Sequence, residues 1–315
     1  MKKLLLAAVA AGAVCAAGSL PASAKTYRFA IVPKSLNNPY FDLARDGCMA
    51  EAKKLGNVTC VYTGPVNQDA AAEVQTIQDL ITRGIDGIAI SVADAGSVQR
   101  VIARARHAGI PVITFDADAP KSARQAYVGT NNMQLGQELA QQVVKLHPAP
   151  GSYAMVSGGP AAENLAQRVD GVRDVLNKAG WKEVAGSPTF CNDDSATGIQ
   201  QMTDLMTGHP DLSAIVPVGG WPLFTQAAFH SFYQTHKSAI DGGKLVVASA
   251  DTLPAELAEV QAGEVGALIG QQPAAMGAKA MDTLLALKHG KHVQKIEYVG
   301  LDTVTKDNVA QFMKQ

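Results

Sequence analysis

The sequence predicts an α/β protein of two doubly wound parallel-sheet lobes, joined by a hinge of three short crossing segments. Short apolar runs alternate with amphipathic stretches along most of the 315 residues, a pattern typical of a parallel sheet that helices cover on both faces. These β/α units are too many for one sheet of ordinary size. No low-complexity or Pro/Ser-rich linker separates the two halves, so we expect crossing strands between the lobes and no flexible tether.

The first lobe is predicted from the strands and helices that alternate before residue 116. The helical pattern is clearest at Val74, Ile77, Leu80 and Ile81, which recur at the spacing of one helical face. A Gly-Ile-Pro turn at 109–111 leads into the last strand of this group. The predicted strands are 27–33, 58–62, 85–92 and 112–115, and the predicted helices are 39–55, 69–83 and 97–108.

The second lobe is predicted because the same alternation then repeats. Its predicted strands are 152–157, 184–190, 214–218, 244–248 and 265–269, and its predicted helices are 134–146, 164–179, 196–208, 223–236, 254–263 and 274–289. We expect the chain to cross between the lobes near Thr130, Gln272 and Lys295. The N-terminal lobe then comprises 25–130 and 273–295, and the C-terminal lobe comprises 131–272 and 296–315.

The first 24 residues predict a secretory signal peptide. Lys2 and Lys3 form a basic start, small apolar residues follow over 4–17, and Ala-Ser-Ala at 22–24 supplies a small-x-small cleavage site. The apolar run is shorter than the roughly 20 residues of a membrane-spanning helix. We therefore expect cleavage after Ala24 and export of the mature chain.

The predicted export affects how the cysteines are interpreted, because an exported protein folds in an oxidising compartment where disulfides form. Cys48 falls in the first predicted helix and Cys60 in the strand that follows it, and such neighbours pack within bridging distance. We predict a Cys48–Cys60 disulfide and a free, buried Cys191. The alternative is that all three are ordinary small core residues.

Polar and aromatic residues gather where the predicted strands end, either directly after a strand or early in the following helix. In open parallel sheets, ligands bind at the carboxyl ends of the strands. Carboxylates and amides suit the hydroxyl groups of a sugar-like ligand, and an aromatic ring can cover its C–H face. The candidate ligand-binding residues are Lys34, Asn38, Tyr40, Phe41, Asp116, Asp118, Asn164, Arg168, Asp193, Trp221, Asp251 and Gln271.

Several of these positions also have a purely structural interpretation. Asn38 can belong to a turn that caps a helix, and the aspartates can cap helices or stabilise loops. Arg168 on a helix can form a surface salt bridge. Asp116 directly after a buried strand needs a partner, and Lys34 can supply it in a structural ion pair. The prediction of a site therefore depends on all of the residues coinciding at strand ends.

Three motifs resemble a known family, the periplasmic sugar-binding proteins of ABC importers of the ribose-binding type. They are LNNPYF at 36–41, GIPVITFD at 109–116 and IGQQP at 269–273. The resemblance implies a type I periplasmic binding protein fold, in which the Asn, the aromatic pair, the Asp and the Gln contact the sugar. It also implies that Arg168 and Asp251 contact the ligand from the second lobe.

Two departures bring the chain closer to the autoinducer- and rhamnose-binding branch of this family. Ala117 stands where ribose-type members usually carry an arginine, and Lys34 stands where they carry a small hydroxyl residue. In that branch the strand-one lysine and the aspartate pair Asp116 and Asp118 face the ligand. The relocated positive charge argues against ribose itself.

The resemblance implies an exported solute-binding protein that closes around a small sugar or sugar-like ligand. It would act in the periplasm, as a monomer without a cofactor, and deliver the ligand to an ABC-transporter permease in the inner membrane. The alternative is a sensing protein that presents the sugar to a chemoreceptor or sensor kinase.

Other classes of function lack their signatures. No phosphate-binding G-x-G-x-x-G follows the first strand, and no nucleophile elbow or His-Glu-x-x-His is present. His289 and His292 lack further convergent ligands for a metal. A net charge of −1 gives no footprint for nucleic acid, and a signal peptide occupies the place of a repressor's DNA-binding helices. We therefore expect neither an enzyme nor a regulator, although Asp116 and Asp118 resemble a hydrolase's carboxylate pair.

Overall fold

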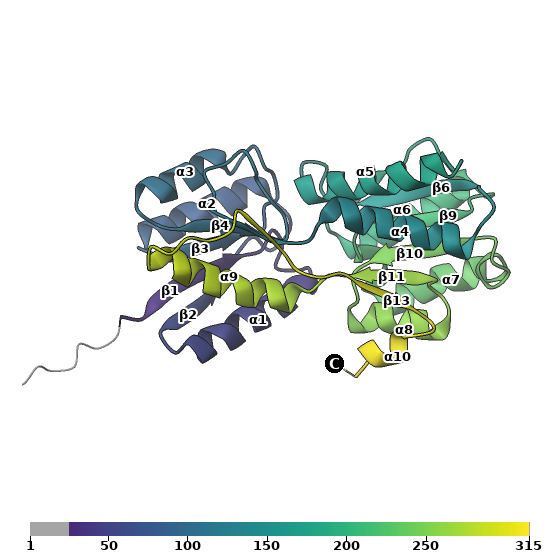
Figure 1. The fold of residues 1–315 in the computed structure, drawn as a ribbon. Helices are drawn as coiled ribbons and strands as arrows, with labels where there is room; N and C mark the ends of the chain where they lie inside the picture. The colour runs from purple at the N-terminus through teal and green to yellow at the C-terminus, as the bar shows by residue number, and fades with distance from the viewer. Residues whose placement is uncertain (1–24, 315) are drawn as a thin grey trace, which may run out of the picture.

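The computed structural model describes residues 25–314 and forms two α/β lobes that lie side by side (Figure 1). The predicted signal peptide of residues 1–24 lies outside the described residues. Within residues 25–314, no helix is both long and apolar enough to cross a membrane. The two-lobed parallel fold that the sequence predicts is confirmed.

The first sheet has six parallel strands in the order β12-β5-β4-β3-β1-β2. Side chains alternate between its faces, so Phe29 and Ile31 of β1 join one apolar cluster while Ala30 and Val32 join another. The first cluster is covered by α1 and α9, and the second by α2 and α3. The elements are β1 (Tyr27–Val32), α1 (Tyr40–Leu55), β2 (Val58–Tyr62), α2 (Ala70–Thr82), β3 (Gly87–Ile90), α3 (Gln99–His107), β4 (Val112–Phe115), β5 (Tyr127–Gly129), α9 (Pro273–Lys288) and β12 (Ile296–Tyr298).

The second sheet has the order β13-β11-β10-β9-β6-β7, with β8 also paired to β6. Only the edge pairing of β13 with β11 is antiparallel within this sheet. Its elements are α4 (Asn132–Leu146), β6 (Ser152–Ser157), α5 (Glu163–Lys178), β7 (Lys182–Glu183), β8 (Thr189–Phe190), α6 (Ser195–Gly208), β9 (Ala214–Pro217), the 3-10 turn η1 (Trp221–Leu223), α7 (Gln226–Asp241), β10 (Val246–Ala250), α8 (Pro254–Ala262), β11 (Ala267–Gly270), β13 (Asp302–Thr305) and α10 (Val309–Phe312).

The chain crosses between the lobes from β5 to α4, from β11 to α9 and from β12 to β13 (Figure 1). The third crossing lies after Tyr298 and not near Lys295, because β12 pairs with β5 in the first sheet. Assigning 296–298 to the C-terminal lobe was therefore wrong. A hydrogen bond from Thr130 Oγ1 to Gln271 Oε1 at 2.8 Å ties the first crossing to the second.

Two further predictions of elements are corrected. Most of the strand predicted at 184–190 is a loop, because β7 ends at Glu183, before the predicted range, and only the two residues of β8 fall inside it. The helix predicted at 223–236 is preceded by the turn η1 and runs from Gln226 to Asp241 as α7.

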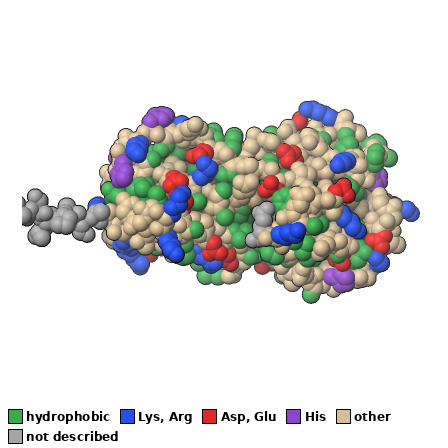
Figure 2. Space-filling model, turned by 60° about the horizontal axis from the view of Figure 1, so that its bottom comes forward, with side chains coloured by type: hydrophobic (Ala, Val, Ile, Leu, Met, Phe, Trp, Pro, Cys, Tyr) green, Lys and Arg blue, Asp and Glu red, His purple; other side chains and the backbone are tan. Residues whose placement is uncertain are grey.

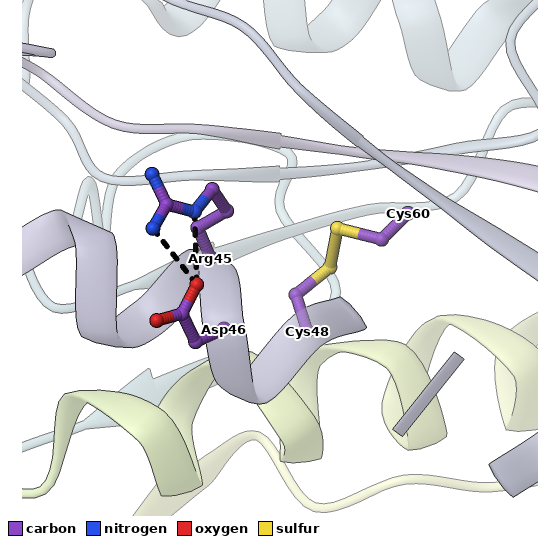
Figure 3. Close-up of a disulfide and its surroundings, with 4 residues drawn as sticks. All are labelled: Arg45, Asp46, Cys48 and Cys60. Carbon is purple, nitrogen blue, oxygen red and sulfur yellow. Dashed lines mark hydrogen bonds and ion pairs between the residues drawn. A yellow bond between two sulfur atoms is a disulfide. The ribbon is translucent and has the colours of Figure 1, made fainter. Parts of the chain in front are cut away.

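The predicted disulfide joins α1 to the neighbouring strand β2 (Figure 3). The Cα atoms of Cys48 and Cys60 lie 6.0 Å apart, and Cys191 is free and buried. On its other side, α1 packs closely on α9, because a Cβ at Gly277 would lie 1.9 Å from the carbonyl oxygen of Ala44. The helix α1, which begins with two candidate site residues, is thus held on both sides.

Charged side chains of both signs are scattered over the face of the molecule that Figure 2 shows. No continuous basic patch covers that face. This distribution agrees with the near-neutral formal charge of −1 for the whole chain.

Candidate ligand-binding site

A small cavity lies between the lobes where the strands of both sheets end. It is lined by residues that the sequence predicts for the site, with the exception of Asp118, and by one that it does not predict, Leu165. The cavity measures about 20 Å³, which is room for about one water molecule. The lining residues are Lys34, Asn38, Tyr40, Phe41, Asp116, Asn164, Leu165, Arg168, Asp193, Trp221, Asp251 and Gln271.

The start of α1 supplies the amide and the aromatic rings of the N-terminal wall. Asn38 Oδ1 accepts a hydrogen bond from the Tyr40 backbone at 3.0 Å, so Asn38 both fixes the first turn and faces the cavity. The ring of Phe41 packs edge-on against Tyr40 and Phe115. Burial, with Asp116 nearby, raises the pKa of Tyr40 well above its ordinary value. Tyr40 therefore presents a neutral hydroxyl.

The carboxylate of Asp116 enters the cavity directly after β4. Its Oδ2 accepts from Ser91 Oγ at 2.6 Å. The ion pair of Lys34 is with Asp193, so the suggested structural pairing of Lys34 with Asp116 is wrong. Ser91 follows β3 at the same edge of the sheet, and the strand-end rule applied to that strand would have found it.

Lys34 instead faces the opposite lobe, where its Nζ lies 3.3 Å from Asp193 Oδ2. Both side chains are almost fully buried. The contact is an ion pair and not a hydrogen bond. Neither carboxylate oxygen of Asp193 has a hydrogen-bond partner among the described residues. The ion pair therefore spans the lobes and leaves Asp193 able to accept from a ligand.

Arg168 organises the C-terminal wall through three donors. Its Nε donates to Asn132 Oδ1 at 2.9 Å, and its Nη1 donates to the Val218 carbonyl at 2.9 Å. Its Nη2 donates to Gln271 Oε1 at 2.7 Å. The close packing of α4 on α5 brings Asn132 to Arg168, since a Cβ at Gly136 would lie 2.0 Å from the Arg168 carbonyl oxygen.

Gln271, which Arg168 holds in place, in turn positions the carboxylate of Asp251. Its Nε2 donates to Asp251 Oδ1 at 2.7 Å, and the Gly220 backbone donates to Asp251 Oδ2 at 3.1 Å. Burial raises the pKa of Asp251, and the charge of Arg168 partly offsets that rise. Arg168 therefore acts on the cavity largely by holding Gln271 and Asp251 in place.

Asn164 adds a second unpaired acceptor to the cavity. Its Oδ1 is buried and, within residues 25–314, has no hydrogen-bond partner. Buried polar atoms in folded proteins are nearly always paired, so each exception needs an explanation. A ligand whose hydroxyl groups donate to Asn164 and Asp193 would satisfy these acceptors.

Three of the site's aspartates have an unusual backbone conformation with positive φ. Asp116, Asp193 and Asp251 have φ values of 57°, 61° and 77°, in the left-handed region that residues other than glycine seldom adopt. A Cβ at Gly158 would lie 2.1 Å from Asp193 Oδ1, so glycine is needed there for Asp193 to reach the cavity. Such conformations cluster at functional sites.

The structure does not bring Asp118 into the cavity, which corrects its prediction as a site residue. Its carboxylate accepts from Arg124 Nε at 2.7 Å and Arg124 Nη2 at 2.5 Å, and from Thr114 Oγ1 at 2.5 Å. This bidentate pair lies within the N-terminal lobe, and Asp118 lines a separate pocket that also contains Arg124 and Tyr127.

Known proteins are similar to this chain in sequence and in architecture. A family model described as a periplasmic binding protein domain matches residues 29–292. The ribose import binding protein of Escherichia coli K12 is 29% identical over 309 residues, covering 97% of this chain and 99% of its own.

Solved structures agree with these sequence matches. An ABC transporter solute-binding protein from Burkholderia graminis, in complex with D-arabinose, is 34% identical with a TM-score of 0.82, covering 91% of this chain and 98% of its own. One from Agrobacterium vitis with bound D-fucose is 26% identical with a TM-score of 0.83, at the same coverage. The chain therefore belongs to the periplasmic binding protein domain family.

Proposed function

We propose that this protein is a periplasmic solute-binding protein that captures a monosaccharide between its lobes and delivers it to an ABC importer. The observation that carries the proposal is a set of buried acceptors with no hydrogen-bond donor among residues 25–314, namely Asn164 Oδ1 and both oxygens of Asp193. Of these, Asp193 Oδ2 has only its ion pair with Lys34. Sugar hydroxyls supply the missing donors. The binding proteins of Escherichia coli and Burkholderia graminis support the transport role.

The proposed mechanism is hinge closure about the three crossings. A cavity of about 20 Å³ is too small for a monosaccharide, so the lobes would have to separate to admit one. The moving units would be 25–130 with 273–298, and 131–272 with 299–314. A ligand that contacts both walls only after closure shifts the equilibrium toward the closed state.

The two walls would divide the contacts between them. Lys34, Tyr40 and Asp116 approach the sugar from the N-terminal lobe, and Asp251 and Gln271 approach it from the C-terminal lobe. Closure removes water from these contacts, which strengthens each hydrogen bond but makes a missing partner costly.

The charges of the cavity favour a neutral ligand. Three carboxylates and two cationic side chains line it, and each nitrogen of Arg168 already donates one hydrogen bond to a described residue. A sugar phosphate or sugar acid would add negative charge beside Asp116, Asp193 and Asp251. We therefore propose a neutral aldopentose or aldohexose, as in the complexes with D-arabinose and D-fucose.

A thermal-shift panel followed by isothermal titration calorimetry tests the proposal. The panel contains neutral pentoses, hexoses, deoxyhexoses and polyols, together with sugar acids and sugar phosphates as controls. At 100 times its dissociation constant, a true ligand should add about 2.7 kcal/mol to the free energy of unfolding. Stabilisation by the charged sugars but by none of the neutral ones would contradict the proposed ligand class. No stabilisation by any sugar would contradict the function.

A further inference from the structure

A cluster of buried acids lies outside the sugar cavity, on and just after α8. Glu256, Glu259 and Glu264 are only 0%, 4% and 7% exposed. Carboxylates are seldom buried unless they are paired. Each of the three therefore needs a partner.

Two of these acids have partners. Glu256 Oε2 accepts from the Leu253 backbone at 2.6 Å, which caps the start of α8. Glu264 Oε1 lies 2.7 Å from His230 Nδ1 of α7. The third acid, Glu259, has no hydrogen-bond partner on either oxygen among residues 25–314. Its burial, with Glu264 nearby, raises its pKa to about 9.

Glu259 lines an open pocket between α7 and α8. The pocket measures about 280 Å³, and its polar lining includes Glu259, Glu264 and His230. Its apolar lining is formed by Ala227, Ala258 and Ala262, whose small side chains leave the space free. The pocket shares no lining residue with the sugar cavity.

We propose that this α7–α8 pocket binds an alkylammonium or alkylguanidinium group, held by Glu259 and Glu264. Such a group carries several N–H donors, which would pair with the oxygens of Glu259 once its side chain turns them from their buried positions toward the pocket. Its methylene stem would lie along the alanines. Among the described residues, no group of three or more His, Cys, Asp or Glu is arranged to hold a metal ion. The pocket therefore fits an organic cation better than a metal.

The protein's own Lys306 is the internal rival for this pocket. A Cβ built on Gly263, which lies between Ala262 and Glu264, would be 3.3 Å from Lys306 Nζ. Lys306 forms no ion pair with either acid in the described part of the chain. The site is thus unfilled by this lysine, and a Lys306→Met variant tests that point.

Isothermal titration calorimetry with propylammonium and propylguanidinium chloride tests the site. Potassium chloride at equal ionic strength and n-propanol serve as controls for screening and for the apolar stem. At about pH 9, where Glu259 ionises and both probes remain cationic, the wild type should bind at least one probe. Glu259→Gln should then weaken that binding about tenfold or more, because the charge-assisted acceptor is lost. Asp204→Asn, which removes one exposed carboxylate from α6 of the same lobe, should bind like the wild type.

The affinity of the probes distinguishes two sources of the cation, a free amine and a side chain of a docked protein. A dissociation constant in the micromolar range would indicate a free amine, whereas one of roughly 1–50 mM would indicate a Lys or Arg side chain presented by a docked protein at high effective concentration. The proposal is overturned if the wild type binds neither probe at about 100 mM, or if Glu259→Gln binds equally well. Binding by Lys306→Met alone would show that the protein's own lysine fills the pocket, and would also overturn it.

Discussion

Asp116 is the residue at which ligand binding and folding should separate most cleanly. It is 3% exposed, lines the cavity and adopts φ of 57°. We choose Asp116→Asn because asparagine tolerates left-handed backbone better than alanine. Losing one charged acceptor should weaken sugar binding by about 1–3 kcal/mol, or roughly 5- to 150-fold. Calorimetry measures this loss, and the melting temperature of the ligand-free protein should change little.

Asp118→Asn is the matched control, with the same chemical change two residues further on. It breaks the bidentate pair with Arg124 inside one lobe, so the free energy of unfolding should fall by about 1–3 kcal/mol. Sugar affinity should stay within about twofold of the wild type. The reverse pattern, with Asp118→Asn impairing binding and Asp116→Asn impairing only stability, would exchange the roles of the two carboxylates.

At this scale, the sequence predicts where a residue lies better than where its side chain points. Parallel strands place Asp116 and Asp251 at the same kind of edge, and this follows from topology alone. The direction of Asp118 depends on Arg124, which lies in a loop without a periodic pattern. The sequence does not reveal the role of Asn132 for a similar reason. Its contact with Arg168 depends on the packing of α4 against α5.

The disulfide acts at the scale of elements, since it fixes α1 against β2. Cys48 and Cys60 are 12 residues apart in sequence, and closing a loop of that size should stabilise the fold by about 3 kcal/mol. The double variant Cys48→Ala, Cys60→Ala should lose that amount in urea-induced unfolding. A reducing agent should bring the wild type to the same midpoint and leave the double variant unchanged. Equal stability of the oxidised wild type and the variant would show that the bridge contributes nothing.

The elements that the sequence predicts well are long and periodic, and the strands that it misses are short, including β5 inside the first sheet and β12 at its edge. The strand β12 has three residues, with Ile296 and Tyr298 exposed, so it lacks a buried pattern. It exists as a strand because β5 offers it a partner 169 positions earlier, and such pairing leaves no local signal. The strands β7 and β8, of two residues each, are likewise defined by β6.

The whole molecule is held closed by contacts on more than one side of the cavity. Leu253, between β10 and α8, belongs to the same apolar cluster as Tyr40 and Phe41 of the other lobe. Phe224 packs against the cores of both lobes. The Lys34–Asp193 pair joins the walls inside the cavity. In the proposed hinge closure, the equilibrium between open and closed forms would therefore depend on an apolar contact as well as on the sugar.

Leu253→Ala should expose that dependence. If Leu253 packs against the other lobe only after closure, removing its methyl groups destabilises the closed form by about 2 kcal/mol. Because the ligand must then supply that free energy, sugar affinity should fall by about tenfold or more. The radius of gyration of the ligand-free protein, from small-angle X-ray scattering, should stay the same or increase. Its free energy of unfolding should change little.

Leu257→Ala, one helical turn further along α8, is the matched comparison for this test. Leu257 lies in the core of the C-terminal lobe itself, so its truncation should lower the free energy of unfolding by about 2–5 kcal/mol. Calorimetry at a temperature where both variants are folded should then find near-normal affinity for Leu257→Ala and weakened affinity for Leu253→Ala. If Leu253→Ala instead unfolds as easily as Leu257→Ala and binds sugar normally, Leu253 stabilises a lobe and takes no part in closure.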